Sequence, residues 1–383
     1  MIKRTLHNVI DDKLFKGKAI IIMGPRQVGK TTLLKQLFND HDDTVLWLNG
    51  DEQDVRSIFE NISSSRLKMI IGDKKVVVID EAQRIADIGL KMKLITDQIP
   101  QVQLISTGSS SFELANLVNE PLTGRKWEYK MLPLSFEEMA GHHGLLEEKR
   151  LIPHRMLYGY YPDVVVHAGE EEELLTQLSD SYLYRDILTL DKIKKSEKIV
   201  KLLQAIALQI GSEVSYNELG QLCGLDSKTV EKYVILLEQS YIVFRLGSFS
   251  RNLRNELKFS RKIYFYDNGI RNATLGNFTQ IENRTDVGAL FENFLISERM
   301  KKVCYHNPTA RSWFWRTTAK QEIDYIEQYN GILSAYEFKW NPKRKATVPS
   351  SFRTAYPEIN FSVISRDNIE DFILSPPRSE INT

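Results

Sequence analysis

The 383-residue chain has few cysteines, almost no net charge and no long apolar segment. The two cysteines, Cys223 and Cys304, are far apart and lack the spacing of a metal or redox motif, so we expect a reducing compartment and no zinc site. A formal net charge of +1 supplies no long-range field, so any affinity for nucleic acid must come from local patches. The sequence has no apolar run of about 18 residues and no N-terminal signal segment. We therefore expect a cytoplasmic protein that does not associate with a membrane.

A glycine-rich loop lies between the apolar segment Ala19–Met23 and the helix-forming segment Thr32–Phe38. It fits the pattern Gly-x-x-x-x-Gly-Lys-Thr of loops whose backbone amides bind the phosphates of a nucleotide. We expect Lys30 to contact the β- and γ-phosphates and Thr31 to bind Mg²⁺. A chance glycine turn is the alternative, and a matching second motif downstream disfavours it. The residues predicted to bind ATP in this region are Gly24, Pro25, Arg26, Gln27, Val28, Gly29, Lys30, Thr31 and Thr32.

The second motif is a continuous apolar segment, Lys75–Glu81, that ends in two carboxylates. Such a segment is typical of a strand buried on both faces. We expect Asp80 to hold Mg²⁺ through water and Glu81 to polarise the attacking water. This layout favours a nucleoside triphosphate hydrolase over a kinase. The alternative is a strand that simply ends in a solvated acidic turn, and the presence of the glycine-rich loop disfavours it.

Two further features point to the same chemistry. A third predicted strand, Val102–Thr107, ends where Ser106 or Thr107 could present a hydroxyl to the γ-phosphate, and we count Thr107 among the nucleotide-binding residues. Arg125 could stabilise transition-state charge in its own subunit or in a neighbouring one. Alternatively, Arg125 could pair with a surface carboxylate, and the sequence leaves both interpretations open.

A different pattern follows from Glu197 to Gly247. A helix over Glu197–Ile210, a second beginning at the capping box Ser215–Glu218 and a third capped by Asp226 are followed by strand-like segments. This order predicts a winged helix. The basic segment Arg251–Lys262 and the helix after Asp226 could contact DNA phosphates, or the module could pack between domains, and the sequence favours neither.

The C-terminal part contains a predicted hairpin with Asn330-Gly331 as its turn. This register places Asp324 opposite Glu337, with Lys339 on the same face. Like charges in facing positions are destabilising, and a divalent cation would neutralise them. Asp324, Glu337 and Lys339 therefore predict metal-dependent phosphodiester cleavage, with both carboxylates holding the metal. A cross-strand ion-pair lattice of the same three residues is the alternative.

Glu292 is a candidate fourth member of this site. It lies in the helix-like segment Ala289–Met300, where its neighbours at helical spacing are largely apolar. A carboxylate on such a face costs free energy unless it has a partner, which fits a place beside a metal. Alternatively, Glu292 could pair with Arg299 or Arg316.

The chain resembles prokaryotic AAA-type ATPases that carry a C-terminal domain of unknown function. The resemblance in the first part of the chain rests on Gly24–Thr31, Ile79–Arg84, Thr107–Ser110, Leu122–Arg125 and Pro133–Glu138. In the second part it rests on Phe265–Gly269, Gly288–Asn293, Trp315–Arg316, Glu322–Asp324 and Glu337–Lys339. AAA-type ATPases more often have Asn at the position of Ser106 or Thr107, so the γ-phosphate contact departs from that pattern. The resemblance implies ATP binding and a C-terminal half that combines a winged helix with a restriction-endonuclease-like fold.

We therefore expect an α/β fold with a parallel sheet and helices on both faces, followed by three further parts. The expected parts are a P-loop AAA-type ATPase domain (1–140), a helical lid or connector (141–195), a winged helix (196–270) and a restriction-endonuclease-like domain (285–383).

The leading functional hypothesis is a DNA-directed ATPase that uses ATP and Mg²⁺ and carries a metal-dependent nuclease domain, active or decayed. The first alternative is an ATP-dependent regulatory switch without nuclease chemistry. The second is a nucleotide-dependent protein that controls a partner toxin or defence enzyme. A homo-oligomer or a protein partner is compatible with each of these hypotheses.

Overall fold

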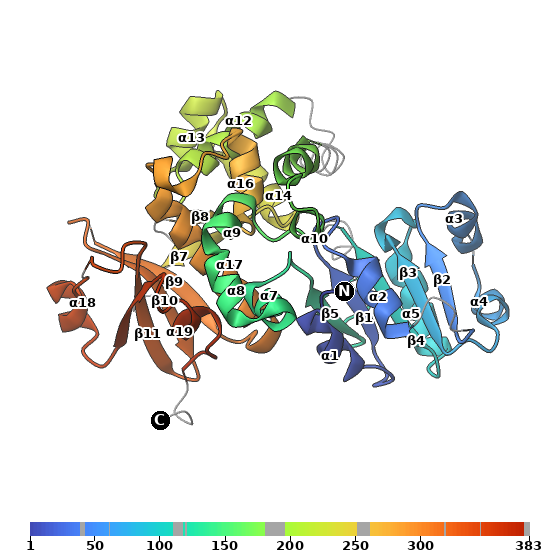
Figure 1. The fold of residues 1–383 in the computed structure, drawn as a ribbon. Coiled ribbons are helices and arrows are strands. Elements are labelled where there is room, and N and C mark those ends of the chain that lie inside the picture. The colour runs from blue at the N-terminus through green and yellow to red at the C-terminus, as the bar shows by residue number, and fades with distance from the viewer. Residues whose placement is uncertain are drawn as a thin grey trace. The chain divides into compact units, whose positions relative to one another are not determined.

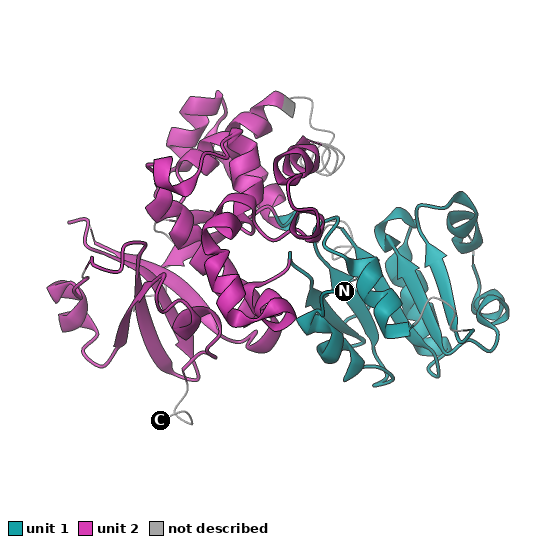
Figure 2. Ribbon diagram, viewed as in Figure 1, with its two compact units in different colours: residues 1–133, 186–192, 239–241 teal, residues 134–185, 193–238, 242–383 magenta. Residues whose placement is uncertain are grey.

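The computed structural model describes residues 1–38, 43–60, 62–109, 118, 121–180, 196–250, 261–317, 319–344 and 346–378. The chain forms two compact units, which Figure 2 shows in different colours. Unit 1 is built mainly from residues 1–133, and unit 2 mainly from residues 134–185, 193–238 and 242–383. No helix in the described ranges is both long enough and apolar enough to cross a lipid bilayer.

Unit 1 contains a five-stranded sheet in the order β2-β3-β4-β1-β5, and every pair of neighbouring strands is parallel (Figure 1). The central strands β1, β3 and β4 are almost entirely buried, as their continuous apolar sequences predict. The α/β fold with a parallel sheet is thereby confirmed. The strands are β1 (Ala19–Met23), β2 (Val45–Asn49), β3 (Val76–Asp80), β4 (Gln103–Gly108) and β5 (Lys126–Lys130).

Helices connect and flank these strands. α1 contacts α2, and α4 contacts α5. Because all the strands run in the same direction, the segments that follow β1, β3 and β4 meet at the carboxyl edge of the sheet. The helices are α1 (Thr5–Asp11), α2 (Lys30–Phe38), α3 (Gln53–Phe59), α4 (Ser64–Ile71), the 3₁₀ helix η1 (Ala82–Arg84) and α5 (Ile88–Gln98).

Unit 2 begins with a group of short helices, and its later helices surround a second sheet. Side-chain caps start several of them: Ser215 and Asp226 each accept a hydrogen bond from the backbone N–H three residues ahead, as predicted. Before β7, the helices that lie entirely within the described residues are α7 (Phe136–His143), α8 (Leu145–Arg150), α9 (Ile152–Tyr158), α10 (Pro162–Val166), α12 (Ser196–Leu208), α13 (Tyr216–Cys223) and α14 (Ser227–Gln239). The helices after β8 are α16 (Asn268–Leu275), η2 (Ile281–Asn283), α17 (Val287–His306), α18 (Ser350–Ala355) and α19 (Glu370–Ile373).

The sheet of unit 2 has seven strands in the order β12-β11-β10-β9-β7-β8-β6. It joins strands that the sequence assigned to separate parts, because β7 pairs with β9 over a short parallel stretch. The winged-helix interpretation of α12–α14 with β6–β8, and the expected domain boundaries, stay predictions. The strands are β6 (Glu213–Val214), β7 (Val243–Ser248), β8 (Arg261–Phe265), β9 (Arg311–Arg316), β10 (Glu322–Tyr329), β11 (Ile332–Lys339) and β12 (Asn360–Ser365).

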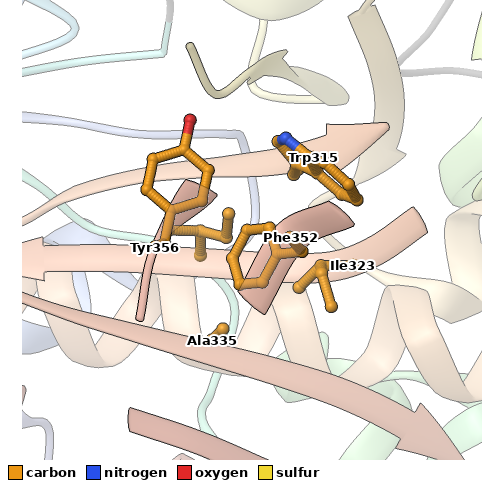
Figure 3. Packing of buried hydrophobic residues seen from close by; sticks show 6 residues of the cluster. Trp315, Ile323, Ala335, Phe352 and Tyr356 are labelled. Carbon is orange, nitrogen blue, oxygen red and sulfur yellow. The ribbon is translucent and has the colours of Figure 1, made fainter. Parts of the chain in front are cut away.

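An aromatic core covers one face of the C-terminal strands (Figure 3). Phe352 of α18 packs edge-on against Trp315 of β9, with ring centroids 4.8 Å apart. Ile323 of β10 and Ala335 of β11 lie beneath these rings and are fully buried. This packing fixes β9, β10 and β11 as one layer.

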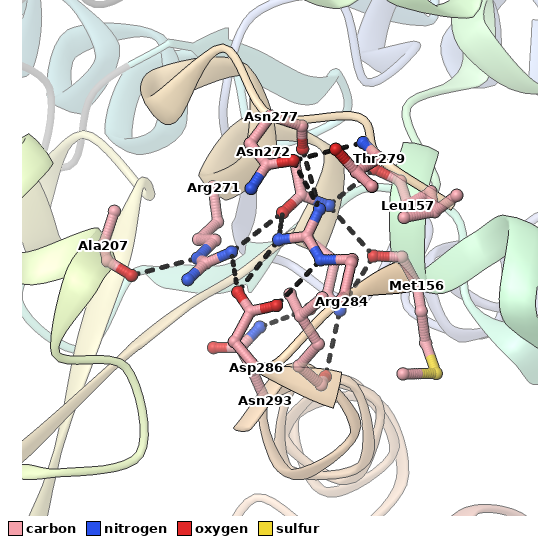
Figure 4. Close-up of polar contacts among 12 residues, drawn as sticks. Met156, Leu157, Ala207, Arg271, Asn272, Asn277, Thr279, Arg284, Asp286 and Asn293 are labelled. Carbon is pink, nitrogen blue, oxygen red and sulfur yellow. Dashed lines mark hydrogen bonds and ion pairs between the residues drawn. The ribbon is translucent and has the colours of Figure 1, made fainter. Parts of the chain in front are cut away.

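A buried polar network holds the helices on which the second candidate site depends (Figure 4). Arg271 donates to the carbonyl of Ala207 in α12 and pairs with Asp286, 2.8 Å away, just before α17. Asn272 donates to the carbonyls of Met156 and Leu157 in α9. Burial alone would raise the pKa of the Asp286 carboxyl, but hydrogen bonds from Arg284 and the charges of Arg271 and Arg284 lower it to about 2. The network therefore joins α9, α12, α16 and the start of α17.

Candidate functional site

The glycine-rich loop lies between β1 and α2, as its sequence predicts. A side chain at Gly24 would come within 1.9 Å of the Met131 carbonyl oxygen, so the loop requires glycine there. The Lys30 ammonium donates to the carbonyl oxygens of Gly24 (2.8 Å) and Pro25 (2.7 Å). The loop thus wraps around a buried cation, and phosphate oxygens are stronger partners for that cation than neutral carbonyls.

A residue outside the loop, which no sequence motif indicates, also supports it. Arg4, which precedes α1, donates to the carbonyl oxygens of Val28 and Leu132, both at 2.6 Å. Its side chain is almost fully buried, so these bonds exchange little with water. Arg4 therefore ties the loop to the end of β5.

Three candidate residues meet at the carboxyl edge of the sheet: Thr31 lies in the helix after β1, Asp80 ends β3, and Thr107 lies near the end of β4. The Thr31 hydroxyl donates to Asp80 at 2.7 Å, and the Thr107 hydroxyl donates to the other oxygen of the same carboxylate. Hydroxyl and carboxylate oxygens are the ligands that Mg²⁺ prefers in proteins. The arrangement of Thr31 and Asp80 therefore fits a magnesium ion bound with a nucleotide.

Glu81 follows directly and has a left-handed backbone conformation, with φ 47°. Its backbone N–H donates to Thr107 Oγ1 at 3.2 Å. Gln83 in η1 donates from Nε2 to the Glu81 carboxylate (2.6 Å) and is 3.1 Å from Ser109 Oγ at the end of β4. Sequence reasoning did not assign Gln83 a role, although it belongs to the motif Ile79–Arg84. Gln83 links the carboxylate of Glu81 to β4.

Arg125 lies away from this site. It precedes β5, and its carbonyl accepts from the N–H of Ala19 at the start of β1. Arg125 is therefore at the amino edge of the sheet, whereas the loop is at the carboxyl edge. Its guanidinium pairs with Asp97 at 2.7 Å and is partly exposed. A catalytic role within the same subunit does not fit this position, and a role toward a neighbouring subunit stays a prediction.

The C-terminal hairpin has the predicted register. Tyr329 pairs with Ile332 and Ile326 with Ala335, while Asn330 and Gly331 both have positive φ in the turn. This register brings Asp324 and the segment Glu337–Lys339 together. Asp324 accepts from the Phe338 N–H at 2.7 Å, and the Lys339 ammonium is 2.6 Å from Glu337.

Glu292 of α17 reaches the same cluster, but its partners differ from the expected ones. It accepts from the hydroxyl of Tyr264 at 2.6 Å and pairs with the ammonium of Lys262 at 3.0 Å, both on β8. The alternative interpretation, in which Glu292 pairs with Arg299 or Arg316, does not match these contacts. Those arginines instead pair with other glutamates, Arg299 with Glu327 and Arg316 with Glu213 and Glu322.

Lys262 also corrects the interpretation of the basic segment Arg251–Lys262. Its side chain is only 1% exposed and pairs with Glu322 as well as Glu292, so it cannot contact DNA phosphates. Arg261 contacts Tyr216 and Glu231, and residues 251–260 lie outside the described residues. In the sequence, Lys262 directly precedes the apolar residues Ile263–Phe265 of β8, and this position could have indicated that its side chain is buried.

The carboxylates of the cluster influence one another strongly. Burial raises the pKa of Asp324 well above its usual range, and the charges of Glu292 and Glu337 raise it further, against the attraction of Lys262. The pKa of Tyr264 is raised by burial and by Glu292. Among the residues that the structure describes, no group of three His, Cys, Asp or Glu side chains is placed to hold a metal ion. In this arrangement, lysines balance the carboxylates.

Comparisons with protein families match three successive parts of the chain. An AAA domain matches residues 16–140, a domain of unknown function (DUF8612) matches 149–281, and a second domain of unknown function (DUF4143) matches 287–373. An uncharacterized protein of Methanocaldococcus jannaschii, MJ1544, is 23% identical, and the match covers 89% of this chain and 80% of that protein. The uncharacterized protein Rv2008c of Mycobacterium tuberculosis is also 23% identical, with 97% and 82% covered.

Two solved structures that match the chain are only remotely similar to it. A STAND (signal transduction ATPase with numerous domains) protein with a tetratricopeptide repeat sensor, PH0952 of Pyrococcus horikoshii, has a TM-score of 0.31 at 12% identity, covering 79% of this chain and 46% of that chain. This chain thus spans less than half of that structure. Drosophila ORC bound to AT-rich DNA and Cdc6 has a TM-score of 0.25 at 12% identity, with 71% and 90% covered. Scores at this level carry no inference about function.

The pKa of Asp324 predicts how Asp324→Asn changes stability. Because the folded-state pKa lies above the unfolded value of about 4, the neutral acid stabilises the fold at low pH, and this contribution is lost as pH rises through the folded-state pKa. Asparagine cannot ionise, so the variant should be more stable than wild type at pH 8 by about 1 kcal/mol or more, and no more stable near pH 4.

Urea melts of the full chain between pH 4 and pH 8 measure this difference. The exposed Asp371→Asn is the matched control and should show no such trend. A less stable Asp324→Asn at pH 8 would mean that an ionised Asp324 stabilises the lattice.

Proposed function

We propose that this chain, which combines an AAA domain with a C-terminal DUF4143 domain, binds ATP with Mg²⁺ at the carboxyl edge of its five-stranded sheet and hydrolyses the β-γ phosphoanhydride. The observation that carries the proposal is the convergence of Thr31, Asp80 and Thr107 beside the loop that surrounds Lys30. These residues come from three separate strand ends, so their meeting is a property of the fold. The AAA domain supports ATPase function independently of this geometry.

Each residue of the site has a distinct role in the proposal. Lys30 exchanges its carbonyl partners for the β- and γ-phosphates, and the loop amides bind the remaining phosphate oxygens. Thr31 and Asp80 would hold Mg²⁺, which when bound neutralises phosphate charge. Glu81 orients and polarises the attacking water. Gln83 holds the Glu81 carboxylate at a fixed distance from β4.

We further propose that DNA directs the ATPase, and the basis for this is helix α14. Lys228 and Lys232 are exposed on this helix, whereas Val230, Val234 and Leu237 are buried. An exposed basic face can bind backbone phosphates but does not read bases. DNA contact by α14 would therefore be electrostatic and independent of sequence.

The alternative of an ATP-dependent switch without nuclease chemistry is favoured by one observation in unit 2. The buried Lys262 pairs with Glu292 and Glu322 in the cluster where metal-dependent cleavage would have to occur. A cluster balanced in this way has no need of a metal. In this alternative, unit 2 transmits the nucleotide state by its contacts and carries out no cleavage.

Two substitutions test the ATP site. Lys30→Ala should abolish ATP binding because it removes the cation of the loop. Glu81→Gln should retain binding but lower turnover by about 100-fold or more, because it removes only the activation of water. Binding of a fluorescent ATP analogue and phosphate release measure the two effects, with exposed Lys68→Ala as the control. Equal turnover in wild type and Glu81→Gln would refute the assignment of Glu81.

Gln83→Ala tests the link between Glu81 and β4. The Glu81 carboxylate should lose its fixed orientation, so kcat should fall by about 10-fold or more while KM for ATP changes little. Steady-state ATP turnover measures both constants, and the exposed Gln101→Ala serves as the control. A raised KM with unchanged kcat would instead place Gln83 among the groups that bind the nucleotide.

The DNA-directed role predicts that duplex, branched or single-stranded DNA stimulates ATP turnover. The double variant Lys228→Glu/Lys232→Glu should lose this stimulation and reduce the salt slope of DNA binding by about 2, since each phosphate contact contributes about one unit. Turnover assays and binding titrations at several salt concentrations measure both quantities. Turnover that no form of DNA stimulates would favour the switch.

A further inference from the structure

A buried ammonium lies at the centre of the carboxylate cluster of unit 2. The Lys262 side chain is 1% exposed, and its Nζ is 3.0 Å from Glu292 Oε1 and also in contact with Glu322 Oε1. Asp324 lies close enough to attract the same charge. A buried cation is strongly unfavourable unless anions surround it, so these contacts hold Lys262 in the charged form. The charged and titratable groups that face the cluster are Glu213, Lys262, Tyr264, Glu292, Arg316, Glu322, Asp324, Glu337 and Lys339.

We infer that Lys262 is the resident cation of the cluster formed by Glu292, Glu322, Asp324 and Glu337, and that it takes the place of a divalent metal. A metal ion at these carboxylates would lie within a few ångströms of the ammonium and would be repelled by it. The cluster therefore binds a divalent cation only when the positive charge of residue 262 is removed. This inference does not depend on ATP hydrolysis, which is assigned to unit 1.

The position of Lys262 in the sheet keeps its ammonium in the cluster. Lys262 pairs with Leu246 of β7 on one side and with Glu213 of β6 on the other, so its backbone is fixed at both edges. Its ammonium lies 5.4 Å from the centre of the Phe314 ring. Hydrogen bonding along both edges of β8 leaves the side chain little freedom to withdraw.

The Glu292 carboxylate is also held by its neighbours. Its carboxylate lies against Gly211, where an added Cβ would be 3.3 Å from Glu292 Oε2. Its other oxygen is bound by both Tyr264 and Lys262. Through Oε1, Glu292 therefore binds two side chains of β8. The ion pairs of Lys262 with Glu292 and Glu322 join α17 and β10 to β8.

Metal-dependent melting of the full-length chain tests the inference. The measurements use the Asp80→Asn background, which removes metal binding at the ATP site. In that background, MnCl₂ should not change the melting temperature of the full-length chain when Lys262 is present. Lys262→Met should lower the melting temperature by about 5 °C or more, because it leaves buried carboxylates without their cation. MnCl₂ should restore a large part of that loss.

Two matched variants make the result specific. Lys339→Met removes the half-exposed lysine that pairs with Glu337, and it should create no response to Mn²⁺. Adding Asp324→Asn to Lys262→Met should abolish the recovery by Mn²⁺, because one carboxylate ligand is lost. A saturable Mn²⁺ stabilisation with Lys262 intact, absent in Asp324→Asn, would overturn the inference. A Lys262→Met protein as stable as its parent would do so as well.

Amine labelling of the wild-type protein gives a second measurement that does not depend on whether Lys262→Met folds. Reductive methylation followed by mass spectrometry should modify the exposed Lys228 fully and leave Lys262 unmodified, with and without MnCl₂. If Mn²⁺ makes Lys262 reactive, the metal displaces the ammonium and Lys262 is not the resident cation.

Discussion

The fold of unit 2 depends on how it accommodates the charged side chain of Lys262, which is only 1% exposed. Removing an ammonium from water costs several kcal/mol, and that cost is offset only if anions are held at fixed positions around it. Glu292 comes from α17 and Glu322 from β10, so both elements must dock against β8 for the fold to tolerate this lysine. The sheet pairing between β7 and β9 is short, which makes these ion pairs an important link between the two halves of the sheet.

Hydrogen bonds beside these ion pairs also hold α17 and α16 in place. Asn293, next to Glu292, accepts from the Phe265 N–H and donates to the Phe265 carbonyl, so α17 is fixed to β8 directly beside the ion pairs. Asp267 caps α16 and accepts from the Tyr160 N–H at 2.6 Å, and burial raises its pKa. The motifs Phe265–Gly269 and Gly288–Asn293 therefore have a structural explanation, because their polar residues satisfy backbone groups that would otherwise be buried without partners.

The sequence was sufficient where the signal is local. The glycine-rich loop, the acidic end of β3 and the Asn330-Gly331 turn each fix their geometry within about ten residues, and the structure places them as expected. The partners of Glu292 were not predictable, because Lys262 and Tyr264 approach it through the docking of α17 onto β8. The contacts of Arg4 and the contact of Gln83 with Ser109 also depend on tertiary packing, so the sequence did not reveal them. The sequence left the role of Arg125 open because the motif does not reveal at which sheet edge the residue lies; the structure pairs it with Asp97.

Asp80 at the end of β3 and Asp324 within β10 show how the neighbours of a strand carboxylate decide what it can bind. Asp80 is bound by the hydroxyls of Thr31 and Thr107, which are neutral and can share its oxygens with a magnesium ion. Asp324 instead lies near the charge of Lys262, and a cation that is already present repels a second one. A carboxylate on a strand therefore favours metal binding when its neighbours are neutral oxygen donors. When a buried lysine balances it, the same carboxylate becomes part of the structural framework.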